Sequence, residues 1–185
     1  MPAKLTPPVS KSDHLLGSPD ALMDLVEYGD YQCPHCGLAY PMVKKIRKTF
    51  GKKLRFVYRH FPLSNVHEYA LPAALAAEAA NNQQRFWEMH DMIYEHQQQL
   101  NGYALLDFAL ELQLNMALFK MDFEDPILAE KVERDFESGV RSGVNGTPSF
   151  FITGYKYNGA YDYQSLSAAI EIFIVQKEYN QRSNR

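Results

Sequence analysis

The chain has 185 residues, of which 46% are hydrophobic and 22% are charged, and its formal net charge is −3. These values are typical of a folded globular protein, and they exclude a disordered chain and a strongly basic nucleic-acid binder. No apolar run reaches the roughly 18 residues that span a bilayer, and the N-terminus has no apolar core of a secretory signal. We therefore expect one folded domain with no membrane insertion, cytoplasmic in this form and periplasmic if a leader has been removed.

The first third of the chain predicts a strand, a helix and a second strand. Residues 1–20 contain scattered prolines and no periodic pattern, so we interpret them as an extended lead-in. The apolar run Leu22–Tyr28 predicts a buried strand, and Leu54–Arg59 alternates as a second strand does. Between them, a helix is expected from Pro34 to about Phe50. The residues expected on its inward face are Leu38, Met42, Ile46 and Phe50. This order is that of a βαβ unit with a parallel strand pair.

The rest of the chain changes character twice. Residues 67–142 carry helical patterns and no strand signal, which predicts an all-helical insertion. The run Thr147–Thr153 is rich in β-forming residues, and a last helix is expected from Tyr163 to about Lys177. Residues 21–66 and 143–178 would then form one α/β domain around the insertion, and 179–185 a polar tail.

The only two cysteines, Cys33 and Cys36, lie between the first strand and the first helix. A thiol at a helix N-terminus is close to unpaired N–H groups, which favour the thiolate. Because both cysteines belong to this motif, none remains for a structural disulfide, a pattern that fits a reducing compartment. The motif therefore predicts thiol–disulfide exchange.

Metal and haem sites are weaker interpretations of the same pair. Two cysteines alone cannot complete a zinc site, and His90 and His96 would lie on different faces of a helix. A c-type haem motif requires histidine where Gly37 stands. We therefore expect no metal and no cofactor beyond the redox-active Cys33–Cys36 disulfide.

The element order and the Cys-Pro-His-Cys motif together resemble the thioredoxin fold, and specifically the DsbA-like branch of thiol:disulfide oxidoreductases. Further stretches that match this branch are Val26–Tyr28, Arg59–Leu63, Phe86–His90 and Gly143–Ile152. The resemblance implies an α/β protein with a mixed central sheet, βαβ followed by ββα, and an all-helical insertion.

The expected roles of the motif residues follow from this chemistry. Cys33 would be the nucleophile with a lowered pKa, and Cys36 would resolve the mixed disulfide that Cys33 forms with a substrate. His35, when protonated, would add positive charge beside the thiolate and make the disulfide more oxidising.

The resemblance also implies roles outside the motif. It implies a cis peptide bond at Thr147–Pro148, where the Thr147 backbone would pair with a substrate strand. Glu27 would be a buried carboxylate that relays the proton of Cys36, although a solvent-facing acid at a strand end is the alternative. Asp30 is interpreted as a turn residue. No role is assigned to His60 or His67.

The function that follows is a monomeric protein-disulfide oxidoreductase that acts on protein thiols and disulfides. Its redox partner is unidentified, or is glutathione. The alternatives are a redox-sensing interaction protein, a reductase or isomerase rather than an oxidase, and an enzyme for a small-molecule thiol, which Cys36 disfavours. The direction of electron flow, the substrates and the reduction potential cannot be derived from the sequence.

Overall fold

The computed structural model describes residues 2–183 and is organised around a five-stranded sheet in the order β1-β3-β2-β4-β5. The strands are β1 (His14–Leu16), β2 (Met23–Gly29), β3 (Leu54–His60), β4 (Ser149–Ile152) and β5 (Tyr155–Lys156). β2 and β3 are parallel, and the other three pairs are antiparallel. The sheet is therefore mixed, and the thioredoxin fold is confirmed.

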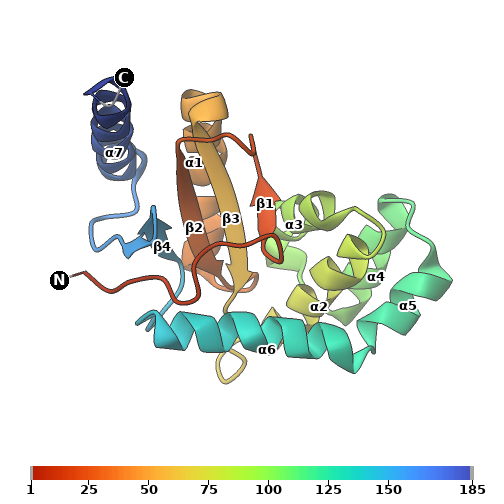
Figure 1. Ribbon diagram of the computed structural model, residues 1–185. Helices are drawn as coiled ribbons and strands as arrows, with labels where there is room; N and C mark the ends of the chain where they lie inside the picture. Colours follow the sequence, from red (N-terminus) through yellow and green to blue (C-terminus); the bar gives the residue numbers. More distant parts are fainter. Residues whose placement is uncertain (1, 184–185) are drawn as a thin grey trace.

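Helices cover both faces of the sheet (Figure 1). Alternate residues of β2 and β3 pack against α1 (Pro34–Phe50) and α7 (Tyr163–Ser183) on one face. The opposite face packs against residues of the N-terminal segment and of α6 (Pro126–Arg141). Because β2 is buried on both faces, its sequence is mostly apolar and does not alternate strictly.

Five helices lie between β3 and β4. They are α2 (Ala70–Asn81), α3 (Phe86–Glu95), α4 (Gly102–Glu111), α5 (Met116–Phe123) and α6. In Figure 1 the first four extend to one side of the sheet, and α6 returns below the ends of β2 and β3. The side chains of Asn101, Asn115 and Asp125 accept hydrogen bonds from the first N–H groups of α4, α5 and α6, and so fix where these helices begin.

The N-terminal segment differs from the expected extended lead-in. His14–Leu16 forms the edge strand β1, antiparallel to β3. Asp13, beside it, forms a buried ion pair with Arg59 of β3, with Nε and Oδ1 2.7 Å apart. A strand of three residues is too short to produce an alternating pattern, so it could not be predicted from its own residues.

The inward face of α1 also differs from the expected one. Leu38 is 72% exposed, whereas the buried residues of α1 are Cys36, Ala39, Tyr40, Val43 and Ile46. A stripe of exact four-residue spacing drifts around a helix of 3.6 residues per turn, so Leu38 and Ile46 do not share one face. Leu38 thus lies on the surface, two residues after Cys36.

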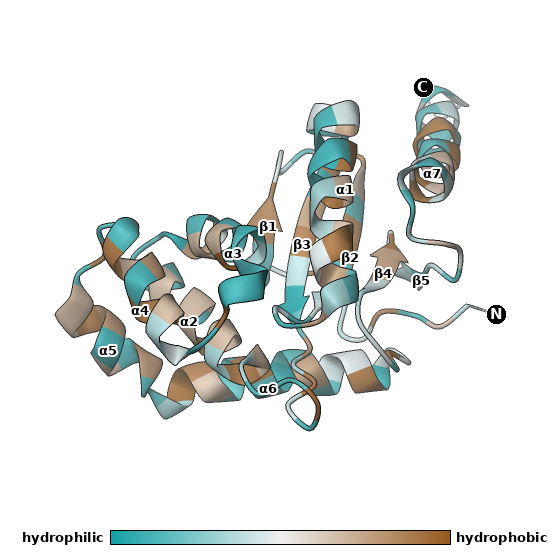
Figure 2. Cartoon of the chain, turned by 180° about the vertical axis from the view of Figure 1, so that it is seen from behind, coloured by the Kyte–Doolittle hydropathy of each residue, from teal (hydrophilic) through white to brown (hydrophobic). Residues whose placement is uncertain are grey.

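The helix α7 continues to Ser183, and so includes most of the expected polar tail. Within residues 2–183, no helix combines the length and the hydrophobicity needed to cross a membrane. α7 is long enough, but polar residues such as Glu171 and Lys177 interrupt it, as the mixed colouring in Figure 2 shows.

Candidate active site

The two cysteines lie where β2 ends and α1 begins. Cys33 is the N-cap of α1, with φ −67° and ψ 121°, and Pro34 occupies the first helical position. No side chain caps this helix end, so the N–H groups of its first turn face the Cys33 sulfur rather than a carboxylate or hydroxyl. Both cysteines are free thiols and both are buried.

The environment of Cys33 favours its thiolate. A hydrogen bond from the Cys36 thiol is the largest cause, and it outweighs burial, so the pKa of Cys33 falls to about 5. The Thr147 side chain and the backbone N–H groups of Cys36 and His35 add to this lowering. In its thiol form, Cys33 donates a hydrogen bond to the Thr147 carbonyl at 3.4 Å.

The pKa of Cys36 is shifted in the opposite direction. Cys36 is fully buried, and burial raises its pKa well above the ordinary value, with a further increase from its bond to Cys33. The backbone N–H of Asp30 approaches the Cys36 sulfur at 3.5 Å. The site therefore combines one acidic and one weakly acidic thiol within a single helical turn.

The lowered pKa of Cys33 makes the stability of the reduced protein depend on pH. Between about pH 5 and its ordinary value of 9.0 the unfolded chain holds the Cys33 proton and the folded chain does not, so stability rises with pH across this window. We expect the reduced protein to gain unfolding free energy relative to Cys33→Ser as the pH increases, and to lose this advantage as the pH falls through the folded value. Urea unfolding of both proteins in reductant measures the difference, and parallel pH profiles would contradict it.

The segment Thr147–Pro148 lies directly across from Cys33. Its peptide bond is cis, and the Thr147 carbonyl is the one that Cys33 contacts. Thr147 Oγ1 is buried and has no hydrogen-bond partner among the described residues. This hydroxyl is therefore available to turn toward a charged Cys33 sulfur.

The His35 side chain contacts Tyr161 on the surface of the protein. Its ring is exposed, and Nδ1 lies 3.0 Å from the hydroxyl of Tyr161, a residue that the sequence did not single out. The contribution of His35 to the lowered pKa of Cys33 comes from its backbone N–H. The effect of a protonated His35 ring on Cys33 stays a prediction.

Glu27 is buried on the sheet beneath the cysteines. Its residue is 3% exposed, which excludes the solvent-facing alternative. Burial, and then the charge of Cys33, raise the pKa of Glu27 to about 8. Its own charge in turn raises the pKa of Cys36, so Glu27 is electrostatically coupled to both cysteines.

Asp30 organises the loop before Cys33, a larger role than that of a turn residue. Its Oδ1 accepts hydrogen bonds from the N–H groups of Gln32 at 2.8 Å and Cys33 at 3.2 Å. Its Oδ2 accepts from the Leu63 N–H at 2.9 Å and lies 2.7 Å from His67 Nδ1. No local sequence signal pairs Asp30 with His67, because 37 residues separate them.

A second cluster of titratable residues is buried beside the sheet. Glu78 Oε1 lies 2.7 Å from His14 Nε2 and 2.9 Å from His60 Nε2. Burial opposes ionisation of Glu78, but the bonds from His14 and His60 outweigh it and hold the pKa of Glu78 well below its usual range. These three residues could each offer one ligand atom to a metal. However, the Lys131 ammonium lies 3.7 Å from the same oxygen and would repel a cation. The geometry is that of a hydrogen-bonded network.

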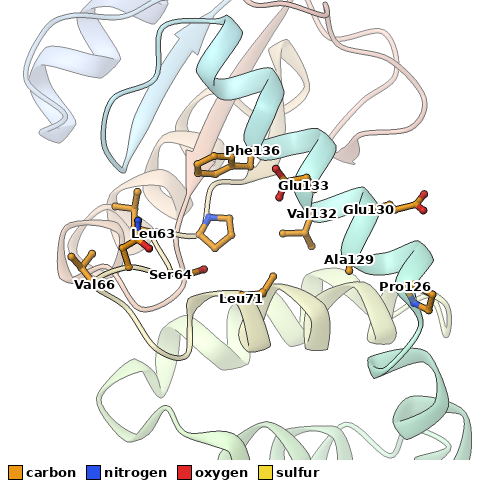
Figure 3. Close-up of a pocket in the computed structure, with 12 residues that line it drawn as sticks. Leu63, Ser64, Val66, Leu71, Pro126, Ala129, Glu130, Val132, Glu133 and Phe136 are labelled. Atoms are coloured by element: carbon orange, nitrogen blue, oxygen red, sulfur yellow. The ribbon is translucent and has the colours of Figure 1, made fainter.

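An apolar groove lies away from the cysteines. It has a volume of about 640 Å³ and is lined by the loop 62–66, by Leu71 and by α6. Figure 3 shows Leu63, Val132 and Phe136 on its apolar walls. Neither cysteine is among its lining residues, although Leu63 in its wall donates a backbone hydrogen bond to Asp30.

Comparisons with known proteins agree with this fold. A family model described as thioredoxin matches residues 9–172. The thioredoxin-like oxidoreductase from Silicibacter pomeroyi DSS-3 is 26% identical, with a TM-score of 0.76 over 88% of this chain and 92% of that one. Oxidised BdbD from Bacillus subtilis shares the fold at 24% identity, with a TM-score of 0.81 over 94% and 99% of the two chains.

The chain is also similar to part of a longer protein. It is 42% identical over 158 residues to the Na(+)/H(+) antiporter NhaA 1 of Salinispora arenicola (strain CNS-205). That match covers 85% of this chain but 24% of the antiporter. The chain thus spans about a quarter of the length of the curated relatives it matches.

Proposed function

This chain belongs to the thioredoxin family, and we propose that it is a thiol:disulfide oxidoreductase that exchanges disulfides with protein thiols through Cys33 and Cys36. The observation that carries the proposal is the opposite shift of the two thiols. The pKa of Cys33 falls to about 5, while that of buried Cys36 rises. A structural thiol pair has no need of such a difference, whereas disulfide exchange requires one sulfur that attacks and leaves easily.

The oxidative reaction proceeds in two exchanges. A substrate thiolate attacks the Cys33 sulfur of the Cys33–Cys36 disulfide, and Cys36 leaves as a thiolate and takes up a proton. A second substrate thiolate then attacks the substrate sulfur of the mixed disulfide and releases Cys33 as a stable thiolate. The substrate loses two electrons to form its disulfide, and the cysteine pair gains them.

The lowered pKa of Cys33 supports oxidation as the direction of the proposed reaction. A lowered pKa of Cys33 stabilises the reduced form of the pair, which makes its disulfide a stronger oxidant. The pair must then be reoxidised by an external disulfide, such as that of glutathione or of a protein partner.

Substrate binding would use the backbone of Thr147. Its carbonyl lies beside the Cys33 sulfur, so an extended peptide could hydrogen-bond there while its own sulfur reaches Cys33. Main-chain pairing of this kind is indifferent to side chains, which suits an enzyme that acts on many protein thiols.

Catalytic turnover tests the proposal. The oxidised protein, with glutathione disulfide as the oxidant, should convert many equivalents of a reduced dithiol peptide to the disulfide. One equivalent of product and no more would contradict an enzyme and favour the redox-sensing alternative. Rapid insulin reduction with no peptide oxidation would reverse the proposed direction.

We propose that Glu27 moves the proton of Cys36. With a pKa raised to about 8, Glu27 holds a proton at neutral pH that it can give to Cys36 as this sulfur leaves. Glu27→Gln keeps the shape and removes the proton, so we expect the step that releases Cys36 to slow by about 100-fold. Single-turnover kinetics with a thiol peptide measure this step. Exposed Glu111 provides the control Glu111→Gln, and equal rates for the two variants would exclude the relay.

A further inference from the structure

Gln97 connects the helical insertion to the cysteine motif. It begins the 3₁₀ turn Gln97–Gln99 between α3 and α4. Its side-chain amide Nε2 donates hydrogen bonds to the Tyr31 carbonyl at 2.8 Å and to the Cys33 carbonyl at 2.9 Å. Both protons of the amide are therefore used on the loop that carries the nucleophile, 64 residues away from Gln97 in sequence.

The hydrogen bond from Gln97 to the Cys33 carbonyl lies at the first turn of α1. The Cys33 carbonyl also accepts the N–H of Gly37 at 3.1 Å, the bond that opens the helix. A Cβ atom on Gly37 would collide with Oε1 of Gln97, so the glycine provides the space that the amide occupies. Gln97 thus lies between the loop and the helix, with its carbonyl and amide ends both in contact with this turn.

The orientation of Cys33 depends on its backbone on both sides. On the N–H side, Cys33 is held by the Asp30 carboxylate at 3.2 Å. On the carbonyl side, the partner outside the helix is Gln97. The Cys33 sulfur meets the N–H groups of His35 and Cys36 because this N-cap residue keeps its extended conformation.

We propose that Gln97 is a positioning residue, through which the helical insertion holds the Cys33 backbone so that the sulfur faces the N–H groups of α1. It acts through Cys33 and touches neither substrate nor sulfur. Without it, the peptide after Cys33 loses its external partner and the N-cap conformation loosens. The consequence for catalysis rests on the proposed function, but the effect on the thiol does not.

The neighbouring glutamines offer a matched control. Gln98 is in the same turn with an exposed side chain. Gln97→Leu removes the amide, and Gln97→Met keeps the length of the side chain but has no charge and no N–H donor. Gln98→Leu changes the composition of the turn in the same way and leaves the contact intact.

The test is a pH titration of the Cys33 thiolate by its ultraviolet absorbance in the reduced full chain. We expect the midpoint in Gln97→Leu and Gln97→Met to rise by about one pH unit, a tenfold change in the thiolate-to-thiol ratio that corresponds to about 1.4 kcal/mol. Gln98→Leu should titrate as the wild type does. Urea unfolding of each variant identifies those that are folded, and Gln97→Met provides the test if Gln97→Leu does not fold.

A Gln97 variant that is folded but less stable, with an unchanged titration, would overturn the proposal and leave Gln97 a structural link between insertion and sheet. An equal shift in Gln98→Leu would overturn it also. The readout needs no turnover. If the Cys33 titration depends on Gln97 but the protein has neither oxidase nor reductase activity, the positioning role is supported and the proposed function is contradicted.

Discussion

Replacing Cys33 with serine is expected to abolish thiol–disulfide exchange. The serine hydroxyl has nearly the same size as the thiol and can still bond to the Thr147 carbonyl, as Cys33 does at 3.4 Å. It cannot form a disulfide, however, and its proton is held far more tightly, so neither exchange step can begin. Residual turnover should fall to the uncatalysed rate of the thiol and disulfide in the assay.

Cys36→Ser should have a different and diagnostic effect. Cys33 keeps the N–H groups of the first helical turn, although it loses the hydrogen bond from Cys36 that contributes most to its low pKa. It can still attack a substrate disulfide, but no second thiol is present to release the product. We expect a mixed disulfide to accumulate, visible as a mass increase that reductant reverses. Wild-type turnover in Cys33→Ser, or no adduct in Cys36→Ser, would contradict the assigned roles.

Arg59→Leu is expected to cause the largest loss of stability. The guanidinium is buried and donates to both carboxylate oxygens of Asp13, at 2.7 and 3.1 Å. It also donates to the Tyr28 hydroxyl and to the carbonyls of Pro7 and Pro8. Removing it leaves a buried carboxylate unpaired, which costs about 3–5 kcal/mol in comparable cases. The N-terminal segment would lose its main anchor to β3.

Denaturant unfolding measures this loss, with Arg134→Leu as the control. Arg134 pairs with Glu130 on α6 at 3.5 Å, and both side chains are mostly exposed. An exposed pair contributes about 0–1 kcal/mol, so this variant should unfold almost as the wild type does. Equal losses in the two arginine variants would show that the Asp13 contact does not anchor the N-terminal segment. The double variant Arg59→Leu/Asp13→Asn should recover part of the loss, because it removes the unpaired charge.

The elements with strong local patterns could be predicted from the sequence. β2 is a short, mostly apolar segment, and β3 alternates, and both patterns are typical of strands. α2 is rich in alanine, which favours a helix. β1 could not be found in this way, because its place depends on β3 and on the Arg59–Asp13 pair rather than on its own residues. The helix α5 is also short, with eight residues, and its main local signal is the Asn115 cap.

In the candidate site, too, the residues of a local motif could be predicted and the contacts between distant segments could not. Cys33 and Cys36 belong to a motif of four residues, and this motif alone predicts thiol–disulfide exchange. The burial of Glu27 and the contacts of His67 and Gln97 arise from segments brought together by the fold, so no spacing rule indicates them. The motif identifies His35 but not its contact, because the ring bonds to Tyr161, which lies 126 residues later in the chain.

The reduction potential of the Cys33–Cys36 pair tests the central claim most directly. Equilibration of the full chain with glutathione redox buffers, followed by quantification of the dithiol and disulfide forms, gives this value. A site that stabilises the Cys33 thiolate should have a potential well above the thioredoxin value of about −270 mV. A potential at or below that value would contradict an oxidising role for this dithiol.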